Sequence, residues 1–314
     1  MVPSGSLTPS IDPAGFGLPA GTALRYERPA DALRSLVASY AVLDSDATIF
    51  KGPHSWVLPG WPQLWIGLTT GEVTVRTRKR QPNVLGTAML FGGTSCAMPT
   101  TSQGGVTVVI DLTPSGWARW FDRPADGLRD QIVPLEQLWS AERTSGLVTC
   151  LHASDQGESV KSVLDEFLLS TLPPPHHEEA FLTEIVMKIG GSGSATAAET
   201  AVALGVSSDT LLRVTKRYFG YPMKVLTRRT RFLRVISEML MTVEPVDHGF
   251  TPPGYHDVSH FLRDAGEFLG MTPRRFLALQ MPYLRAVLRA RTMVIGAPLP
   301  LLDPIAIECG LGTA

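Results

Sequence analysis

The order of apolar and polar positions divides the chain into a strand-rich front half and a helical back half. Past residue 42, short apolar runs alternate with Gly, Pro, Thr and Asn, as in SWVLP, QLWIGL, EVTVRT, LGTAMLF and VTVVIDL. Many short strands separated by turn residues are typical of an antiparallel barrel or sandwich. We therefore predict a β-rich domain over residues 31–132, suited to sensing a signal or to dimerisation.

Apolar residues at helical spacing predict helices on both sides of these strands. The segment DALRSLVASYAV, residues 31–42, would place on one helix side Leu33, Leu36, Val37 and Tyr40. The same spacing returns in LEQLWSAERTSGLVTCLHA and over residues 158–172. The prolines of LPPPHHEE cannot lie inside a helix and predict a stiff spacer. Residues 133–177 are thus predicted to hold connector helices and a linker.

The remaining segments complete a two-domain organisation. Residues 1–30 are rich in Pro, Gly and Ser and predict a flexible arm. Beyond the linker, helical spacing predominates over residues 178–292, and residues 293–314 form a tail. The predicted fold class is α+β with two domains. A β-rich, barrel- or sandwich-like N-terminal domain precedes an all-α C-terminal domain with two helix-turn-helix units.

Composition and length agree with a globular two-domain protein. The chain has 314 residues, of which 44% are hydrophobic and 18% charged, so both domains can bury cores. The three cysteines, Cys96, Cys150 and Cys309, are widely spread, which suits a reducing compartment. The first residues lack the pattern of a signal peptide, and no apolar run is long enough to span a membrane. We expect a cytoplasmic protein with no membrane partner.

The stretch SATAAETAVALGVSSDTLLRVTKRYFG, residues 194–220, follows the plan of a helix-turn-helix motif. A helix in AAETAVALG ends at Gly205, because glycine tolerates the left-handed conformation that closes helices. Ser207 then stands where an N-cap begins a second helix. That helix would project outward Arg213, Lys216 and Arg217. A helix, a tight turn and a basic second helix favour DNA binding.

The local charge supports this interpretation, although the formal net charge of the whole chain is −1. Between Gly205 and Arg234 the only acid is Asp209, and the eight basic residues are Arg213, Lys216, Arg217, Lys224, Arg228, Arg229, Arg231 and Arg234. Such an excess of positive charge is what contacts with phosphates require. A charge run alone would be as well explained by a solvated helix face.

A second unit of the same kind follows the first. The segment GYHDVSHFLRDAGEFLGMTPRRFL begins at Gly254, and its Gly270 lies 50 residues after Gly220. Both of these glycines follow an apolar or aromatic residue and precede a proline by two or three positions. The spacing predicts an internal repeat of a helical unit.

The second segment is similar to the signature of the second helix-turn-helix of the AraC/XylS family of transcription regulators. The segment LGVSSDTLLRVTKRYFGYPMK resembles the matching first motif, so that the resemblance covers roughly residues 178–278. The front half resembles the β-rich domain that accompanies some of these regulators. The segments that carry this resemblance are ALRSLVASYAV, WVLPGWPQLWIGL and VTVVIDLTPSGWARWF. The resemblance implies a transcription regulator that binds duplex DNA, with no catalytic residues and no cofactor.

The resemblance also implies which residues contact DNA. Two units joined by a long helix would each place a recognition helix in the major groove. Base edges would be met in the first unit by Ser208, Asp209, Leu212 and Arg213, and in the second by Val258, Ser259, His260 and Arg263. Phosphates would be met by Lys216, Arg217 and Arg228. The predicted set is completed by Ser207 and Thr210 at the start of the first recognition helix.

Three departures from the family pattern shift the expected DNA contact to the first unit. Thr215 stands where the family packs an aromatic residue, and Ala265-Gly266 stands where it has Phe-Lys. Prolines in VEPVDHGFTPP, residues 243–253, disfavour the helix that should support the second recognition helix. The second unit would then pack against its neighbours and read few bases.

Other functional interpretations of the sequence remain open. His256 with His260, and His176-His177-Glu178-Glu179, have the residue types of metal ligands, but we predict no metal site. Trp56, Trp61 and Trp65 would fill a core or line a pocket for a small-molecule effector. The main alternative is a ligand-binding or protein-interaction module whose repeat no longer reads DNA. An enzyme built on the β-rich domain is the third class, and a homodimer would form through helices at 134–145 and 158–172.

Overall fold

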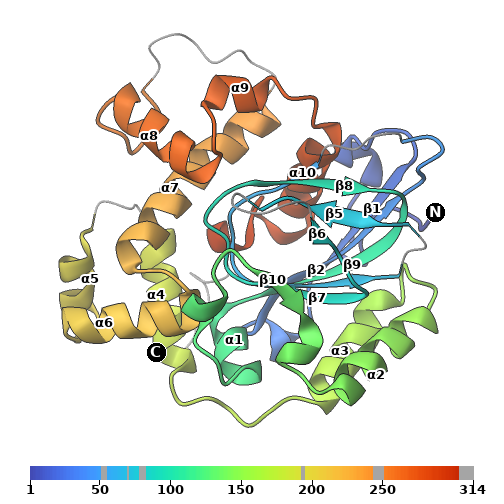
Figure 1. The fold of residues 1–314 in the computed structure, drawn as a ribbon, viewed down its shortest axis with the longest axis horizontal. Helices are drawn as coiled ribbons and strands as arrows, with labels where there is room; N and C mark the ends of the chain where they lie inside the picture. The colour runs from blue at the N-terminus through green and yellow to red at the C-terminus, as the bar shows by residue number, and fades with distance from the viewer. Residues whose placement is uncertain (51–54, 69–70, 78–82, 192–194, 243–250, 304–314) are drawn as a thin grey trace.

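The structure is a computed structural model that describes residues 1–50, 55–68, 71–77, 83–191, 195–242 and 251–303. Two antiparallel sheets occupy the N-terminal half, and the C-terminal half is helical (Figure 1). This arrangement confirms the predicted α+β fold class, with a sandwich-like front half. The sheets do not close into a barrel in the described part of the chain.

The larger sheet has six strands in the order β1-β2-β9-β4-β7-β10. Their bounds are β1 Thr22–Glu27, β2 Val37–Ser45, β4 Gln63–Gly67, β7 Ala88–Phe91, β9 Gly105–Leu112 and β10 Ile132–Pro134. The smaller sheet has the order β3-β8-β5-β6. Its strands are β3 Ser55–Val57, β5 Val73–Val75, β6 Asn83–Val84 and β8 Met98–Ser102. The five runs that predict strands in the sequence all contain one, at β3, β4, β5, β7 and β9.

The larger sheet is buried on both faces, which explains the nearly continuous apolar sequence of β9. Because successive side chains point to opposite faces of a strand, Val108 and Ile110 pack with the helices on one side. Val109 packs on the other side with Trp65, Phe91 and residues of the last helix. The sheet therefore forms the central layer of the molecule.

The prediction of a helix over residues 31–42 is wrong. Asp31–Leu33 form one 3₁₀ turn, and Val37–Ser45 form the long strand β2. Strand β2 pairs with β1 on one side and with β9 on the other. A segment that is apolar on both faces also satisfies helical spacing, and the two strand partners decide between the alternatives.

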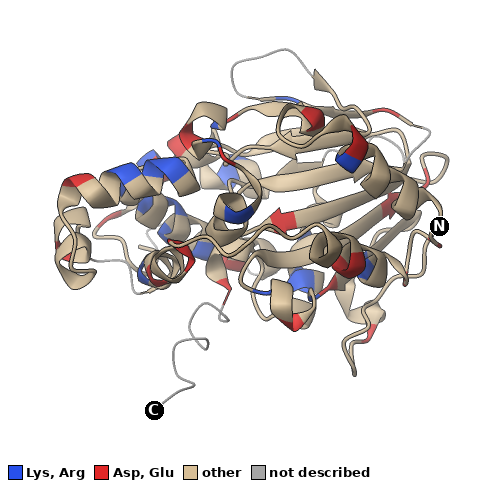
Figure 2. Ribbon diagram, turned by 90° about the horizontal axis from the view of Figure 1, so that it is seen from below, with Lys and Arg blue, Asp and Glu red and all other residues tan. Residues whose placement is uncertain are grey.

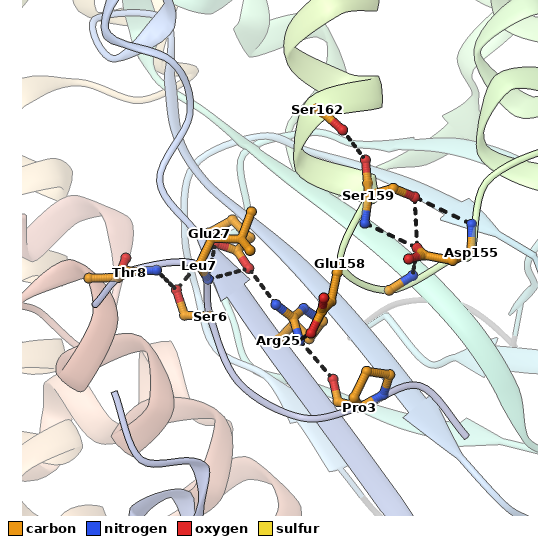
Figure 3. Close-up of polar contacts among 11 residues, drawn as sticks. Pro3, Ser6, Leu7, Thr8, Arg25, Glu27, Asp155, Glu158, Ser159 and Ser162 are labelled. Atoms are coloured by element: carbon orange, nitrogen blue, oxygen red, sulfur yellow. Dashed lines mark hydrogen bonds and ion pairs between the residues drawn. The ribbon is translucent and has the colours of Figure 1, made fainter. Parts of the chain in front are cut away.

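The predicted flexible arm over residues 1–30 differs from the structure, which holds this segment against the sheet. Residues 22–27 are the buried strand β1, and Phe16 is fully buried. The Leu7 backbone N–H donates to Glu27, and the Pro3 carbonyl accepts from Arg25 at 3.1 Å (Figure 3). Arg25 also pairs with Glu158, so the segment connects the sheet to the turn before helix α3, Val160–Ser170.

Among the described residues, three α-helices belong to the front half and its connector, and seven follow the linker. The first three are α1 Pro114–Trp120, α2 Ala141–His152 and α3 Val160–Ser170. The others are α4 Glu179–Gly190, α5 Ala197–Ala203, α6 Ser208–Val214, α7 Met223–Met241, α8 Val258–Phe268, α9 Pro273–Leu277 and α10 Pro282–Ile295. Helices α2 and α3 fall in the predicted connector, and Pro173 to Pro175 have no regular structure between α3 and α4. None of the described helices has the length and apolar character needed to cross a bilayer.

The last helix returns from the helical half to the sheets. Helix α10 packs against β1, against the 3₁₀ turn Pro13–Phe16 and against α7. Arg28 donates to the carbonyls of Val294 and Ile295, at 3.0 Å each. It thereby supplies hydrogen-bond donors to two backbone carbonyls at the C-terminal end of α10. The division of the chain into domains stays a prediction. Helix α10 follows the helical half in sequence but packs on the sheet of the front half.

An ion pair also joins the two halves at the linker. Arg119 of α1 donates through Nη2 to Glu179 of α4 at 2.6 Å. Burial opposes ionisation of Glu179, but hydrogen bonds from Arg119 and from the His176 backbone outweigh it, so the pKa of Glu179 is lowered.

We predict that Glu179→Gln lowers the free energy of unfolding by roughly 1 kcal/mol at pH 7, because the pair is partly screened by solvent. A lowered carboxyl pKa stabilises the fold above the pKa of the unfolded chain, and this stabilisation is lost as the pH falls through the folded value. Urea unfolding of both proteins from pH 7 to pH 3 should therefore show a difference that disappears at acidic pH. A difference that is independent of pH would contradict the role of this carboxylate.

Candidate nucleic-acid interface

The first helical unit has the turn geometry predicted from the sequence. Thr196 and Glu199 form a capping box at the start of α5. Gly205 adopts a φ of 66° after α5, and the Val206 N–H donates back to the Ala201 carbonyl at 3.0 Å. Ser207 caps α6 by accepting a hydrogen bond from the Thr210 N–H at 3.1 Å. Helix α6 is thereby fixed relative to α5 by a tight turn.

Helix α6 buries one face and presents the other to solvent. Leu211 and Val214 are buried, whereas Leu212 is 40% exposed and Arg213 is exposed. The helix continues as a π-helical turn, Thr215–Phe219, which ends at Gly220 with a φ of 79°. The Thr215 hydroxyl is buried and donates to the Leu211 carbonyl at 2.8 Å. A threonine that donates to the preceding turn disturbs regular helix geometry, consistent with a π turn here.

The second unit repeats this arrangement 50 residues later. Asp257 caps α8 by accepting a hydrogen bond from the His260 N–H at 2.7 Å. Phe261 and Ala265 are buried, whereas Leu262 is 44% exposed and Arg263 is exposed. Gly270 closes the unit with a φ of 73°. The repeated glycines of the sequence therefore mark structurally equivalent helix ends.

Leu262 is a candidate contact that the sequence interpretation missed. A shift of 50 residues places Leu262 opposite Leu212 and Arg263 opposite Arg213. Both leucines belong to the few large apolar side chains that remain exposed in the described residues. An exposed leucine beside an arginine suits a base step with a thymine methyl group and a guanine edge. The 50-residue repeat is the signal that could have found Leu262.

The basic residues of the first unit are divided between solvent and internal contacts. Arg229 is buried and donates to the Thr94 carbonyl at 2.7 Å, and Arg234 donates to the Gly190 carbonyl at 2.7 Å. Arg217 lies 3.4 Å from Asp122 at the surface. The side chains that make no hydrogen bond or ion pair with any described residue are Arg213, Lys216 and Lys224. Figure 2 shows Lys and Arg gathered at the end of the molecule where these helices lie.

Arg228, predicted to contact phosphate, is held between α7 and α8. Its Nη2 donates to Asp264 at 2.5 Å and to Glu267 at 2.7 Å. Burial would lower the pKa of Arg228, but the hydrogen bonds to these two carboxylates raise it above its ordinary value. This geometry favours a structural role, because a phosphate contact would compete with two existing ion pairs.

Asp264 is the centre of this contact between the two units. Its carboxylate is fully buried and lies 3.4 Å from Arg231 as well as beside Arg228. The Tyr255 hydroxyl donates to the same carboxylate at 3.0 Å. Each oxygen of Asp264 is thus hydrogen-bonded, as a buried carboxylate requires.

The other predicted contact residues lie on α6 and α8 or at their N-terminal ends, with unequal exposure to solvent. Ser207, Ser208, Asp209 and Ser259 are exposed, and Thr210 and Val258 are half-buried. His260 is also half-buried, because its ring packs edge-on against Tyr255 and lies 3.3 Å from Arg231. Their contact with DNA remains a prediction. A regular helix was not expected over residues 243–253. Residues 243–250 lie outside the described part of the chain, and residues 251–253 are not helical.

The histidine group at 176–179, considered as metal ligands, has other contacts. The rings of His176 and His177 stack at 4.5 Å, and Glu179 is paired with Arg119. Within the part of the chain that the structure describes, no group of three His, Cys, Asp or Glu side chains is placed to hold a metal ion. The absence of a metal and of a cofactor remains an expectation.

The front half contacts both helical units through the loop between β7 and β8. The Tyr221 hydroxyl donates to the Gly93 carbonyl at 2.8 Å, next to the end of the first unit. The Ala97 N–H donates to the Phe268 carbonyl of α8 at 2.8 Å. One loop of the sheet domain therefore holds the C-terminal ends of both units.

A comparison with protein families agrees with this geometry. Residues 200–278 match a family described as a helix-turn-helix domain. The C-terminal region carries a helix-turn-helix domain of the AraC type. The match confirms the resemblance drawn from the sequence over residues 200–278, which run from within α5 through α6, α7 and α8 to just past α9.

Solved structures of AraC-like proteins share low similarity with the chain. An apo variant of ToxT from Vibrio cholerae strain SCE256 is 13% identical, with 76% of this chain and 96% of that chain covered and a TM-score of 0.40. Wild-type ToxT from the same strain, bound to an unsaturated fatty acid, is 12% identical, with coverages of 72% and 90% and a TM-score of 0.41. The AraC-like activator CuxR is 11% identical, with coverages of 62% and 73% and a TM-score of 0.23. No curated protein matches the chain.

We predict that Asp264→Asn destabilises the AraC-type domain by about 3–5 kcal/mol, because Arg228 and Arg231 would lose a fully buried counter-charge. Urea unfolding monitored by tryptophan fluorescence measures this change. Glu267→Gln is the matched control, since the side chain of Glu267 is 42% exposed and its loss should cost less than about 1 kcal/mol. Equal effects of the two substitutions would contradict the central role of Asp264.

Proposed function

We propose that the protein is a sequence-specific DNA-binding regulator of transcription. In this proposal α6 and α8 are the recognition helices, and α6 makes most of the contacts in the major groove. The matched pairs of an exposed leucine and an exposed arginine on the two helices carry the proposal. An apolar and a guanidinium side chain next to each other on both helices would give the two units the same means of contacting base edges.

Base recognition is supported by the chemistry of these side chains. An arginine can donate two hydrogen bonds to one guanine, and a leucine can contact the thymine methyl group. Ser208 and Asp209 are exposed on the same first turn of α6. An aspartate there can accept a hydrogen bond from a cytosine amino group, which would add discrimination at an adjacent step.

Fewer side chains would be available to bind phosphate than the number of basic residues in the sequence of the first unit indicates. Lys216 and Lys224 lie on either side of the turn at Gly220 and have no ion pair among the described residues. Arg228, Arg229, Arg231 and Arg234 are occupied by internal partners. We therefore infer a modest salt dependence of DNA affinity for one domain, because few phosphates are neutralised.

We predict that Arg213→Ala weakens binding to the preferred duplex by about 1–3 kcal/mol and relaxes the preference at one base position. The preferred duplex is first selected from a random library at two salt concentrations. Arg263→Ala in the second unit should have a smaller effect if α6 is the main reader. Affinity is measured by fluorescence anisotropy with labelled duplexes.

The control for this experiment is Arg34→Ala, an arginine in the front half whose side chain is 44% exposed and paired only with Asp31 among the described residues. It removes the same charge outside the helix-turn-helix units and should leave affinity and preference unchanged. Failure to enrich any duplex at either salt concentration would reject sequence-specific DNA binding. The result would then favour a protein-interaction module whose helical repeat no longer reads DNA.

The front half is proposed to sense a small molecule and to support a homodimer. Helices α2 and α3 pack on one another along the edge of the molecule, and Leu169 of α3 is 41% exposed. A dimer through these helices would place two AraC-type domains on repeated half-sites and raise affinity by effective concentration.

A further inference from the structure

The loop between β7 and β8, residues 92–97, is hydrogen-bonded to separate parts of the helical half. Tyr221, just past the first unit, donates to one carbonyl of the loop at 2.8 Å, and Arg229 of α7 donates to the next at 2.7 Å. The Ala97 N–H donates to the Phe268 carbonyl, at the C-terminal end of α8, at 2.8 Å. One short loop therefore contacts the end of the first unit, the helix that joins the units, and the end of the second unit.

Within the front half this loop is itself held in place. Thr94 exchanges hydrogen bonds with Gly60, whose N–H donates to the threonine hydroxyl at 2.9 Å and whose carbonyl accepts from the threonine N–H at 3.1 Å. Ser95 donates to both carboxylate oxygens of Asp130, at 2.6 Å and 2.8 Å. A Cβ atom at Gly92 would lie 1.9 Å from a backbone oxygen of the neighbouring turn. Such contacts oppose local opening, so the loop presents its bonds to the helices from fixed positions.

Apolar packing joins the same parts of the molecule. One buried cluster contains side chains of the front half, of α7 and of α8, among them Leu58, Trp61, Ala97, Phe232 and Phe268. Protein interiors are packed closely enough that a displacement of one element is transmitted to its neighbours. The position of α8 relative to α7 therefore depends on the front half as well as on the contact between the two helices.

The buried charge of Arg229 is costly for stability. Its side chain is 1% exposed, its acceptor is the neutral Thr94 carbonyl, and its Nε has no partner among the described residues. Burial lowers the pKa of Arg229, because the charged form loses its solvation, although Tyr221 and Asp130 oppose this shift. An apolar side chain of similar volume often stabilises a fold as well as a buried charge does, or better. A contribution to stability therefore does not explain this arginine.

The separation of the two recognition helices decides which DNA they can contact together. Successive major-groove segments on one face of a duplex lie about 34 Å apart, and one base pair corresponds to about 3.4 Å along the axis. Two units held at one separation therefore read two DNA elements at one spacing. Units joined by α7 without a second support could move relative to each other and accept more than one spacing.

We propose that the loop of residues 92–97 sets the spacing between the two DNA elements that the chain reads, and that Arg229 is the positioning residue through which it does so. The inference rests on the proposed function, in which α6 and α8 both enter the major groove. It gives the front half a direct part in selecting the DNA sequence, in addition to sensing and dimerisation. In this arrangement Asp264 orients α8 on α7, and Arg229 holds both helices against the loop.

A distance measurement without DNA tests the positioning role. Nitroxide labels are attached at Ser208→Cys on α6 and Ser259→Cys on α8, both exposed positions, in a chain whose Cys150 and Cys309 are replaced by serine. Electron paramagnetic resonance should give one narrow distribution of label distances for this chain. Addition of Arg229→Met should broaden it, because the bond between α7 and the loop is lost. Equally narrow distributions would overturn the role of Arg229.

Arg234→Met is the matched control for this substitution. Arg234 lies on the same helix and donates to the Gly190 carbonyl at 2.7 Å, a bond that stays within the helical half. The substitution removes the same charge and the same type of hydrogen bond without a change at the loop, so the distribution should stay narrow. Equal broadening in both variants would also contradict the proposal, because the loop would then have no special part.

Duplexes of altered spacing test the consequence for recognition. In the duplex that the natural protein selects, the two elements are moved apart or together by one base pair. Fluorescence anisotropy should show that the natural protein loses about tenfold in affinity, comparable to one mismatched base pair, whereas Arg229→Met loses less than about threefold. Equal losses in the two proteins would reject the inference.

Unfolding in urea separates the positioning role from a structural one. Arg229→Met should unfold at nearly the same urea concentration as the natural protein, because the substitution also removes a buried charge. A large loss of stability with an unchanged preference for spacing would assign Arg229 a structural role and reject the proposal. Arg229→Lys retains a donor for the Thr94 carbonyl and should restore most of the preference for one spacing.

If Arg229→Met fails to fold, Tyr221→Phe takes its place, since it removes only the hydroxyl that donates to the same loop and should also broaden the label distances. Failure to select any duplex would reject the proposed function, and the label distances would still decide whether the loop positions the two units. A protein that selects a duplex but tolerates every change of spacing would remain a regulator and would contradict this inference.

Discussion

The buried carboxylate of Asp264 fixes the relation between the two helical units. It lies at the contact of α7 and α8, where Arg228 and Arg231 neutralise its charge and Tyr255 donates to it. Around it the rings of Phe232, Phe261 and Phe268 pack at 5.5–5.6 Å. A buried charge tolerates few alternative arrangements, because any shift would leave it unpaired in an apolar surrounding. The direction of α8 relative to α7 therefore depends on this residue.

The same constraint extends to the front half through backbone groups. The loop between β7 and β8 bonds to Tyr221, to Arg229 and to the end of α8. Helix α10 completes the connection from the other side by packing on β1 and on α7. The sheets and the two helical units thus share a small set of connecting elements.

The positive charge of the first unit shows where reasoning from the sequence reached its limit. The eight basic residues between Gly205 and Arg234 look alike in a count of charges. In the structure Arg229 is buried, and Arg228 and Arg231 neutralise an acid more than thirty residues away in sequence. Helical spacing predicts which residues share a side of a helix, but not which carboxylate another helix places there. Arg213 was identified correctly as outward-facing because its helix neighbours Leu211 and Val214 are apolar.

The sequence by itself determined the local elements of the helical half and their repeat. Gly205, Ser207, Gly220 and Gly270 are positions where only a few residue types suit the backbone, so caps and turns could be predicted from identity alone. Only the tertiary structure decided that residues 37–45 form a strand, that residues 1–8 bind to the sheet, and that α10 packs on β1. These outcomes depend on partners distant in sequence. Strand pairing and the burial of both faces of a segment leave no local signature in the chain.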